Sequence, residues 1–250
     1  MRLFLFHHAG GSAALYGGWA ELFPADWDVV CCDAPGRGSA LGLAPLRDVE
    51  ALAAHFRAQL APAMDAPFAF FGHSMGAVLA YELALRLERE GGPAPCWVGL
   101  SACSAPRPGH TPEPVSTYSG EQLAAWLVSA GGTDPGVARH PLIFRMLEPV
   151  LRSDLEVVES WRPVAGQRPL AAALTVFGAH DDALVETAKL AAWPRHSTAF
   201  SGFHLYEGGH FYLRSHTEKV TEQIVREIES ADGSSAREFH SVSESCEHSA

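Results

Sequence analysis

Short apolar runs alternate with helical patterns along most of this chain, and this alternation restricts the possible folds more than any other feature. Four runs of apolar, β-branched or aromatic residues end in turn residues and predict buried strands, at Arg2 to Phe6, Trp27 to Cys32, Phe68 to Phe71 and Trp97 to Leu100. The strand pattern resumes at Leu174 to Phe177 and Phe200 to Tyr206. Helical patterns lie at Ala13 to Phe23, Val49 to Met64, Met75 to Glu90, Glu186 to Trp193 and Tyr212 to Ser230. This order predicts an α/β protein with a mostly parallel sheet and helices on both faces.

The alternation is interrupted between residues 105 and 166. The segment from Pro106 to Pro114 is too rich in proline for regular structure. Two amphipathic helices follow: the first begins at Ser119, which fits a capping box with Gln122, and the second covers Pro141 to Trp161. We therefore predict that residues 105–166 form a helical lid inserted into a core made of residues 1–104 and 167–230. Residues 231–250, rich in serine and charge, are predicted to be a disordered tail.

Composition and charge exclude several classes of protein. Hydrophobic residues make up 47% and charged residues 19% of the 250 positions, which suits one globular domain with a large core. The net charge of -11 disfavours nucleic acid as a partner. No apolar run could span a membrane, and Met1 to Phe6 is too short for a signal-peptide core, so we expect a cytoplasmic protein. The five cysteines form no Cys-x-x-Cys pair and are expected to be free thiols.

The segment from Gly72 to Gly76 matches the pattern Gly-x-Ser-x-Gly. Alone the match is weak, but here it follows a predicted strand and opens a predicted helix, as a nucleophile elbow requires. In such an elbow a sharp turn exposes the serine hydroxyl above the sheet edge, and the flanking glycines let strand and helix pass closely. Ser74 is therefore predicted to be a catalytic nucleophile.

A serine nucleophile needs a histidine base and a carboxylate that orients it, and in this fold both follow the serine along the chain. His210 comes directly after the strand at Phe200 to Tyr206, preceded by two glycines, and is the predicted base. The carboxylate must come from Asp181 or Asp182, which follow the preceding strand. We favour Asp181, because Gly-x-x-Asp counted from Gly178 is the usual spacing.

Two backbone amides are expected to bind the oxyanion of the tetrahedral intermediate. One is the N–H of Met75, the residue after the nucleophile. The other is the N–H of Ala9, in the glycine-rich loop after the first strand. His7 and His8 have no Asp, Glu or His at ligand spacing nearby, so no metal site and no cofactor is predicted.

With these residues placed, the chain resembles the type II, or editing, thioesterases of polyketide and nonribosomal peptide synthases, relatives of fatty-acid thioesterase II. The resemblance extends from Met1 to about Ser230. It rests on Ala9-Gly10-Gly11-Ser12-Ala13 with Tyr16 and Trp19, on Pro35-Gly36-Arg37-Gly38, on Gly72-His73-Ser74-Met75-Gly76, on Leu151-Arg152-Ser153-Asp154 and on Gly208-Gly209-His210-Phe211. The sequence departs from the family pattern in two respects: it begins almost at the strand Arg2 to Phe6, where a short N-terminal segment would be expected first, and His7-His8 stands where a proline and an aromatic residue are frequent.

The resemblance implies hydrolysis of acyl thioesters on the phosphopantetheine arm of acyl or peptidyl carrier proteins, by a protein expected to be a monomer. It also implies a lid over the acyl chamber, which we expect Leu123, Trp126 and Leu127 to face. Two alternatives stay open at this stage. The first is an acyltransferase or a carboxylester hydrolase with the same fold and triad. The second is a catalytically inactive scaffold with the hydrolase fold.

Overall fold

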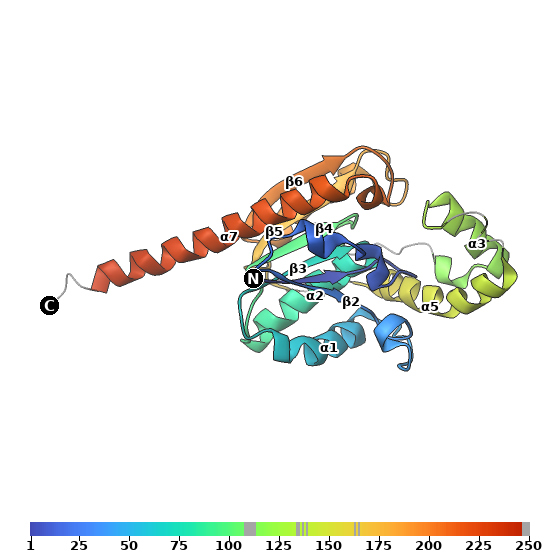
Figure 1. The fold of residues 1–250 in the computed structure, drawn as a ribbon, viewed down its shortest axis with the longest axis horizontal. Coiled ribbons are helices and arrows are strands. Elements are labelled where there is room, and N and C mark those ends of the chain that lie inside the picture. Colours follow the sequence, from blue (N-terminus) through green and yellow to red (C-terminus); the bar gives the residue numbers. More distant parts are fainter. Residues whose placement is uncertain are drawn as a thin grey trace.

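The computed structural model describes residues 1–107, 114–133, 136, 138, 140–162, 164 and 166–246, with side chains described as far as residue 233. Its centre is a six-stranded parallel sheet with the strand order β2-β1-β3-β4-β5-β6. The strands cover Arg2–Phe6 (β1), Asp28–Cys32 (β2), Phe68–His73 (β3), Trp97–Ser101 (β4), Ala173–Ala179 (β5) and Phe200–Tyr206 (β6). All six predicted strands are confirmed, and so is the α/β class (Figure 1).

Alternate side chains of the strands enter two separate cores, one on each face of the sheet. On β1, Phe4 and Phe6 join the core beneath helices α1 (Val49–Leu60) and α2 (Met75–Glu90). Leu3 and Leu5 join the other core, beneath α7 (Thr217–Cys246). Because both faces of the inner strands are covered, β1, β3 and β4 read as nearly continuous apolar runs, which is why they could be recognised in the sequence.

Two predicted helices are shorter or different in kind. The pattern at Ala13 to Phe23 forms two 3-10 helices, Ala13–Tyr16 and Trp19–Leu22, because Gly17 and Gly18 separate them and Gly18 has a φ of 79°. The pattern at Glu186 to Trp193 forms the short α6 (Thr187–Leu190), followed by a 3-10 helix at Trp193–His196. The remaining 3-10 turns are Gly38–Ala40, Ala61–Ala63, Val115–Thr117 and Tyr212–Arg214.

The C-terminal segment differs from the prediction. Instead of a disordered tail from residue 231, α7 continues to Cys246 and runs beyond the edge of the sheet, while residues 247–250 lie outside the described part (Figure 1). The segment has no proline after Thr217, and adding residues to an existing helix gains one hydrogen bond per residue without a new nucleation cost. A helix can therefore extend here without a core of its own.

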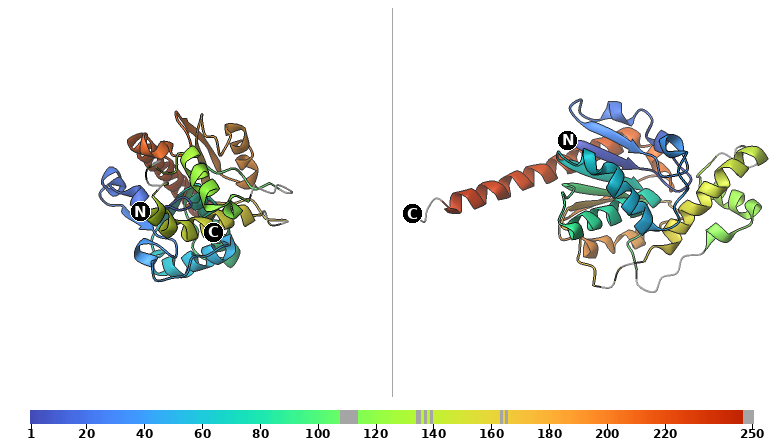
Figure 2. Two further views of the ribbon diagram at one scale, coloured as in Figure 1. Left: turned by 90° about the vertical axis from the view of Figure 1, so that its right-hand side faces the viewer. Right: turned by 90° about the horizontal axis from the view of Figure 1, so that it is seen from below.

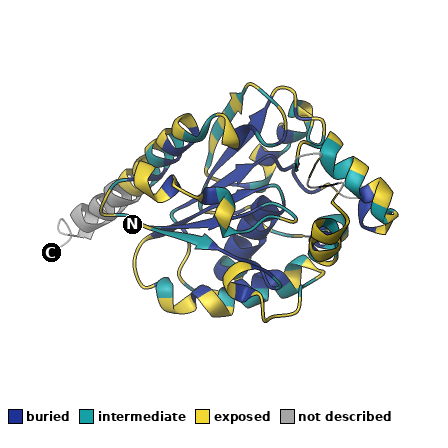
Figure 3. Cartoon of the chain, turned by 45° about the vertical axis from the view of Figure 1, so that its right-hand side comes forward, coloured by how far each residue is buried: buried dark blue, intermediate teal, exposed yellow. Residues whose placement is uncertain are grey.

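The lid lies at the end of the molecule opposite the end of α7 (Figures 1 and 2). Its described helices are α3 (Gly120–Ser129) and α5 (Pro141–Ser160), and the predicted capping box of Ser119 and Gln122 is present at the start of α3. The half of α5 after Pro149 is largely buried, whereas Leu142 and Met146 before it are exposed. The four inner strands β1, β3, β4 and β5 are buried in their central part, the edge strands β2 and β6 are mostly intermediate or exposed, and so is the lid (Figure 3).

Candidate active site

Ser74 lies on a sharp turn between β3 and α2, as the sequence predicts, with backbone angles φ 56° and ψ -114°. A positive φ is strained for a serine and needs support from its neighbours. The turn is supported by close packing: a Cβ on Gly72 would lie 1.9 Å from the carbonyl oxygen of Gly76, and one on Gly76 would lie 2.1 Å from that of Phe6. Ser74 also donates its backbone N–H to the carbonyl of Ser101 at 2.8 Å. The geometry is that of a nucleophile elbow.

His210 follows β6, and its ring forms a hydrogen bond of 2.8 Å between Nδ1 and Oδ2 of Asp182. Both side chains are almost fully buried. The other carboxylate oxygen of Asp182 accepts the backbone N–H groups of Leu184 and Val185, at 2.8 and 2.9 Å. Each oxygen of this carboxylate is therefore engaged, and the histidine ring is held by an acceptor that cannot rotate freely.

The prediction that Asp181 supplies the carboxylate is wrong. Asp181 is exposed, and its backbone N–H donates to the carbonyl of Gly208. The predicted end of the strand was too early. β5 continues to Ala179, two residues beyond the predicted Phe177, and Ala179 still pairs with Tyr206. Gly178 therefore belongs to the strand rather than to the loop, and counting from it selects the wrong aspartate.

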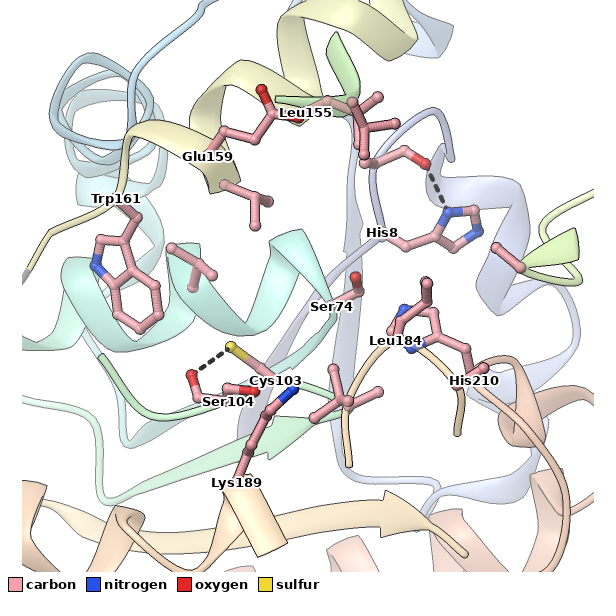
Figure 4. A pocket seen from close by; sticks show the side chains of 18 of the residues that line it. His8, Ser74, Cys103, Ser104, Leu155, Glu159, Trp161, Leu184, Lys189 and His210 are labelled. Carbon is pink, nitrogen blue, oxygen red and sulfur yellow. Dashed lines mark hydrogen bonds between the residues drawn. The ribbon is translucent and has the colours of Figure 1, made fainter. Parts of the chain in front are cut away.

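Ser74 and His210 both line one cavity of about 490 Å³ beneath the lid (Figure 4). His8 and Leu184 belong to the wall near these two residues, while Trp161 lies at the far side. The lining comes from loops after β1, β3, β4, β5 and β6 and from the lid, so the cavity lies at the carboxyl ends of the strands. This is the usual place for a ligand site in a parallel α/β sheet.

Two of the three predicted lid residues line the cavity. Trp126 and Leu127 belong to its wall, as expected. Leu123 does not: it is fully buried in a small cluster within the lid, with Val115, Leu151 and Leu155. Helical spacing placed Leu123 on the same face as its neighbours but could not show that α5 and the turn at Val115 cover it.

The predicted amide donors belong to residues that follow β3 and β1, which are neighbouring strands of the sheet. Met75 is the first residue of α2, where the amides have no partner within the helix and the helix dipole favours negative charge. Ala9 lines the cavity, and its carbonyl accepts a hydrogen bond of 2.9 Å from Nδ1 of His8. Both residues thus lie at the end of the sheet where Ser74 is found, and their role as oxyanion donors stays a prediction.

Three histidines around the site are uncharged at neutral pH. Burial lowers the pKa of both His7 and His8 to about 4, and burial lowers the pKa of His73 well below its usual value. His7 Nδ1 bonds the carbonyl of His8, and its Nε2 accepts the N–H of Ala34, so His7 joins the ends of β1 and β2. His73 lies under the His210 ring, with 5.2 Å between ring centroids, and its Nδ1 lies 2.8 Å from the hydroxyl of Ser101. The patterns in the sequence did not indicate these supporting roles.

Among the residues that the structure describes, no group of three or more His, Cys, Asp or Glu side chains is arranged to hold a metal ion, and no helix is long and apolar enough to cross a membrane. Of the five cysteines, Cys31, Cys32, Cys96 and Cys103 are free.

A serine on a strand-to-helix turn, an aspartate-bound histidine on a later loop and a parallel sheet covered by a lid define the α/β-hydrolase fold. The chain belongs to the thioesterase family, since the family model described as Thioesterase domain matches residues 1–231.

Individual relatives agree with this assignment. The probable cadicidin biosynthesis thioesterase of Streptomyces griseus is 35% identical over 228 residues, which cover 91% of this chain but only 62% of that protein's length. Thioesterase TesA of Mycobacterium marinum is 31% identical, with 89% of this chain and 88% of that protein covered.

Among solved structures, the type II thioesterase BorB from the borrelidin biosynthetic cluster has a TM-score of 0.82 and 33% identity, covering 91% of this chain and 92% of that one. RedJ, a thioesterase from the prodiginine biosynthetic pathway in Streptomyces coelicolor, has a TM-score of 0.83 and 31% identity, covering 91% and 90%. The resemblance to type II thioesterases stated from the sequence is confirmed.

Proposed function

We propose that this protein hydrolyses acyl thioesters held on the phosphopantetheine arm of acyl or peptidyl carrier proteins, as an editing thioesterase of polyketide or nonribosomal peptide synthesis. The observation that carries the proposal is that Ser74 and an Asp182-bound His210 line one cavity beneath a lid. The apolar side chains of Trp126 and Leu127 in that cavity suit an acyl chain. The family and the named relatives support the same substrate class.

Acylation begins at Ser74. His210 removes the proton of the Ser74 hydroxyl, and the oxygen attacks the thioester carbonyl carbon to form a tetrahedral intermediate. The charge that forms on histidine is stabilised by the Asp182 carboxylate, which also holds the ring with Nδ1 protonated. The intermediate collapses as the carbon–sulfur bond breaks, and the thiolate takes the proton from His210. An acyl-serine remains.

Deacylation uses the same residues, with water as the nucleophile and the Ser74 oxygen as the leaving group. His210 removes a proton from water, the resulting hydroxide attacks the acyl carbon, and the bond to the Ser74 oxygen breaks as that oxygen regains the proton. In both steps the amides of Met75 and Ala9 hold the oxyanion. A thiolate leaves readily even without full protonation, so a modest site suffices for this chemistry. We expect no metal or dissociable cofactor, because serine and histidine supply both nucleophile and base.

Carrier-bound substrate is the partner that this function requires, and we propose that the enzyme acts on it as a monomer. The test compares one acyl group on a carrier protein, on N-acetylcysteamine and on p-nitrophenol. The proposal predicts a clear preference in kcat/KM for the carrier-bound thioester, with free acid as the product. Preference for the p-nitrophenyl ester would favour a carboxylester hydrolase, and transfer to an acceptor other than water an acyltransferase. Failure of a fluorophosphonate probe to label Ser74 would favour an inactive scaffold.

A further inference from the structure

Two motifs of the sequence have no role in the chemistry above, yet they meet in the folded protein. Arg37 comes from the loop after β2, and Asp154 comes from the buried half of lid helix α5, 117 residues further along the chain. The pair is bidentate: Arg37 Nη2 donates to Asp154 Oδ1 at 2.7 Å, and Nη1 donates to Oδ2. Both residues are buried, with 8% of Arg37 and 2% of Asp154 exposed.

The pair also holds the loop that follows β1. Asp154 Oδ2 accepts the backbone N–H of Gly10 at 2.7 Å, and Arg37 Nη1 donates to the carbonyl of Gly11 at 3.3 Å. Arg37 Nη2 donates in addition to the carbonyl of Pro35 at 3.2 Å, which ties the pair to its own loop. Three segments distant in sequence therefore meet at one buried carboxylate.

These bonds fix the peptide group next to the proposed oxyanion donor. The peptide between Ala9 and Gly10 is held at both ends, because its carbonyl accepts from His8 Nδ1 and its N–H donates to Asp154. Gly10 has a φ of +71°, and a Cβ there would lie 3.0 Å from Leu151 Cδ1 of α5. The loop is thus pressed against the lid helix as well as bonded to it, and it has little freedom to turn the Ala9 N–H away from the cavity.

Burying an ion pair costs free energy, because both charges lose their hydration, and apolar side chains of similar size are often as stabilising. Its advantage is a defined geometry. We infer that Arg37 and Asp154 are positioning residues, which clamp the Ala9–Gly10 loop to lid helix α5 so that the Ala9 amide stays aimed at the oxyanion. The inference rests on the proposed function, since it needs an oxyanion at this place. If so, the oxyanion hole is correctly formed only while α5 is packed against the loop.

The test is Asp154→Asn, with Glu156→Gln as the matched control. Glu156 lies two residues away on α5 and also bonds to the core, through Arg47 at 2.6 Å, but this exposed pair has no contact with the loop. Three quantities are compared: kcat/KM for an acyl-N-acetylcysteamine thioester, the inhibition constant of an alkylboronic acid that forms a tetrahedral adduct with serine, and the affinity for a non-hydrolysable thioether analogue of the substrate.

For Asp154→Asn we expect kcat/KM to fall by about 10- to 100-fold, as misplacement of a catalytic group by about 1 Å would cause. The inhibition constant of the boronic acid should rise by a similar factor, while the affinity for the thioether analogue should change less than about twofold. Only the tetrahedral boronate adduct uses the oxyanion hole. Glu156→Gln should change none of the three. Equal weakening of the boronic acid and the thioether, or unchanged kinetics, would overturn the inference.

A double variant, Arg37→Met with Asp154→Leu, separates positioning from stability, because it leaves no uncompensated buried charge. It should unfold at a temperature closer to wild type than the single variant does, yet keep the loss in kcat/KM. Recovery of activity together with stability would show that the pair only stabilises the fold. Failure of the wild-type enzyme to form a boronate adduct at Ser74 would contradict the proposed function instead, whatever the variants do.

Discussion

The Nδ1 atom of His210 lies 2.8 Å from Oδ2 of Asp182, while the neighbouring Asp181 is exposed to solvent. Only one of two adjacent aspartates can therefore orient the histidine. The backbone amides of Leu184 and Val185 hold the second oxygen of Asp182, so its orientation does not depend on the histidine alone.

Asp182→Asn should lower kcat by about 10³-fold or more, because the amide can present an N–H to His210 and favour the wrong tautomer. Asp181→Asn is the matched control and should retain most of the activity, since its side chain is exposed. The measurement is steady-state hydrolysis of one acyl thioester by both variants. A larger loss in Asp181→Asn would return the role to that residue.

Ser74→Ala should abolish turnover while the fold is kept. Alanine can occupy the position at φ 56° because the close packing of Gly72 and Gly76, rather than the serine hydroxyl, maintains the turn. The expected loss in kcat is several orders of magnitude, roughly the whole contribution of the triad. Circular dichroism and thermal unfolding provide the control, and activity above a few per cent of wild type would mean that another residue is the nucleophile.

Gly76→Ala should destabilise the protein severely, because the added Cβ would lie 2.1 Å from the carbonyl oxygen of Phe6 in a fully packed region. A forced backbone shift of this kind costs about 3 kcal/mol or more. Gly42→Ala is the control, since a Cβ there meets no atom within 4 Å. Urea denaturation of both variants measures the difference, and equal unfolding free energies would refute the packing argument.

Stability should fall as the pH is lowered from 7 to 5. Burial holds the pKa of His7 at about 4, below its usual 6.5, so between these values the unfolded chain binds a proton that the folded protein does not. The unfolding free energy therefore decreases with falling pH, by up to about 1.4 kcal/mol per pH unit for each such histidine. His8 adds to the effect in the same direction.

The comparison that isolates His7 is urea denaturation of wild type and His7→Gln at pH 7, 6 and 5. The variant should be less stable at pH 7, because it disturbs the bond to Ala34, but its stability should depend less steeply on pH. An identical slope in the two proteins would show that His7 is not buried in its neutral form.

The sequence predicted an element or a site residue best where a short segment alone determines it. The continuous apolar strands, the Gly-x-Ser-x-Gly turn at Ser74 and the loop histidine His210 could be placed because each is defined by its immediate neighbours. The choice between Asp181 and Asp182 failed because it depends on where β5 ends, and the pairing with β6 that extends β5 to Ala179 is not a local property.

Long-range contacts explain the other differences. Leu123 has the spacing of a cavity residue, but α5 and the turn at Val115 bury it within the lid. The pair of Arg37 and Asp154 joins residues 117 positions apart, and no pattern of spacing could indicate that their side chains meet. A chain can show which residues are chemically suited to a site, whereas packing between distant segments decides which of them are used.

In the proposed reaction an acyl group passes from a carrier thioester to the Ser74 oxygen before water releases it. This step can be tested by rapid mixing of the enzyme with an acyl-carrier protein, acid quenching within milliseconds and mass spectrometry of peptides. We expect a transient peptide containing Ser74 whose mass is increased by the acyl group, and we expect no such peptide in Ser74→Ala. Hydrolysis of the same substrate with no acylated Ser74 peptide at any time, or an acyl group on another residue, would contradict it.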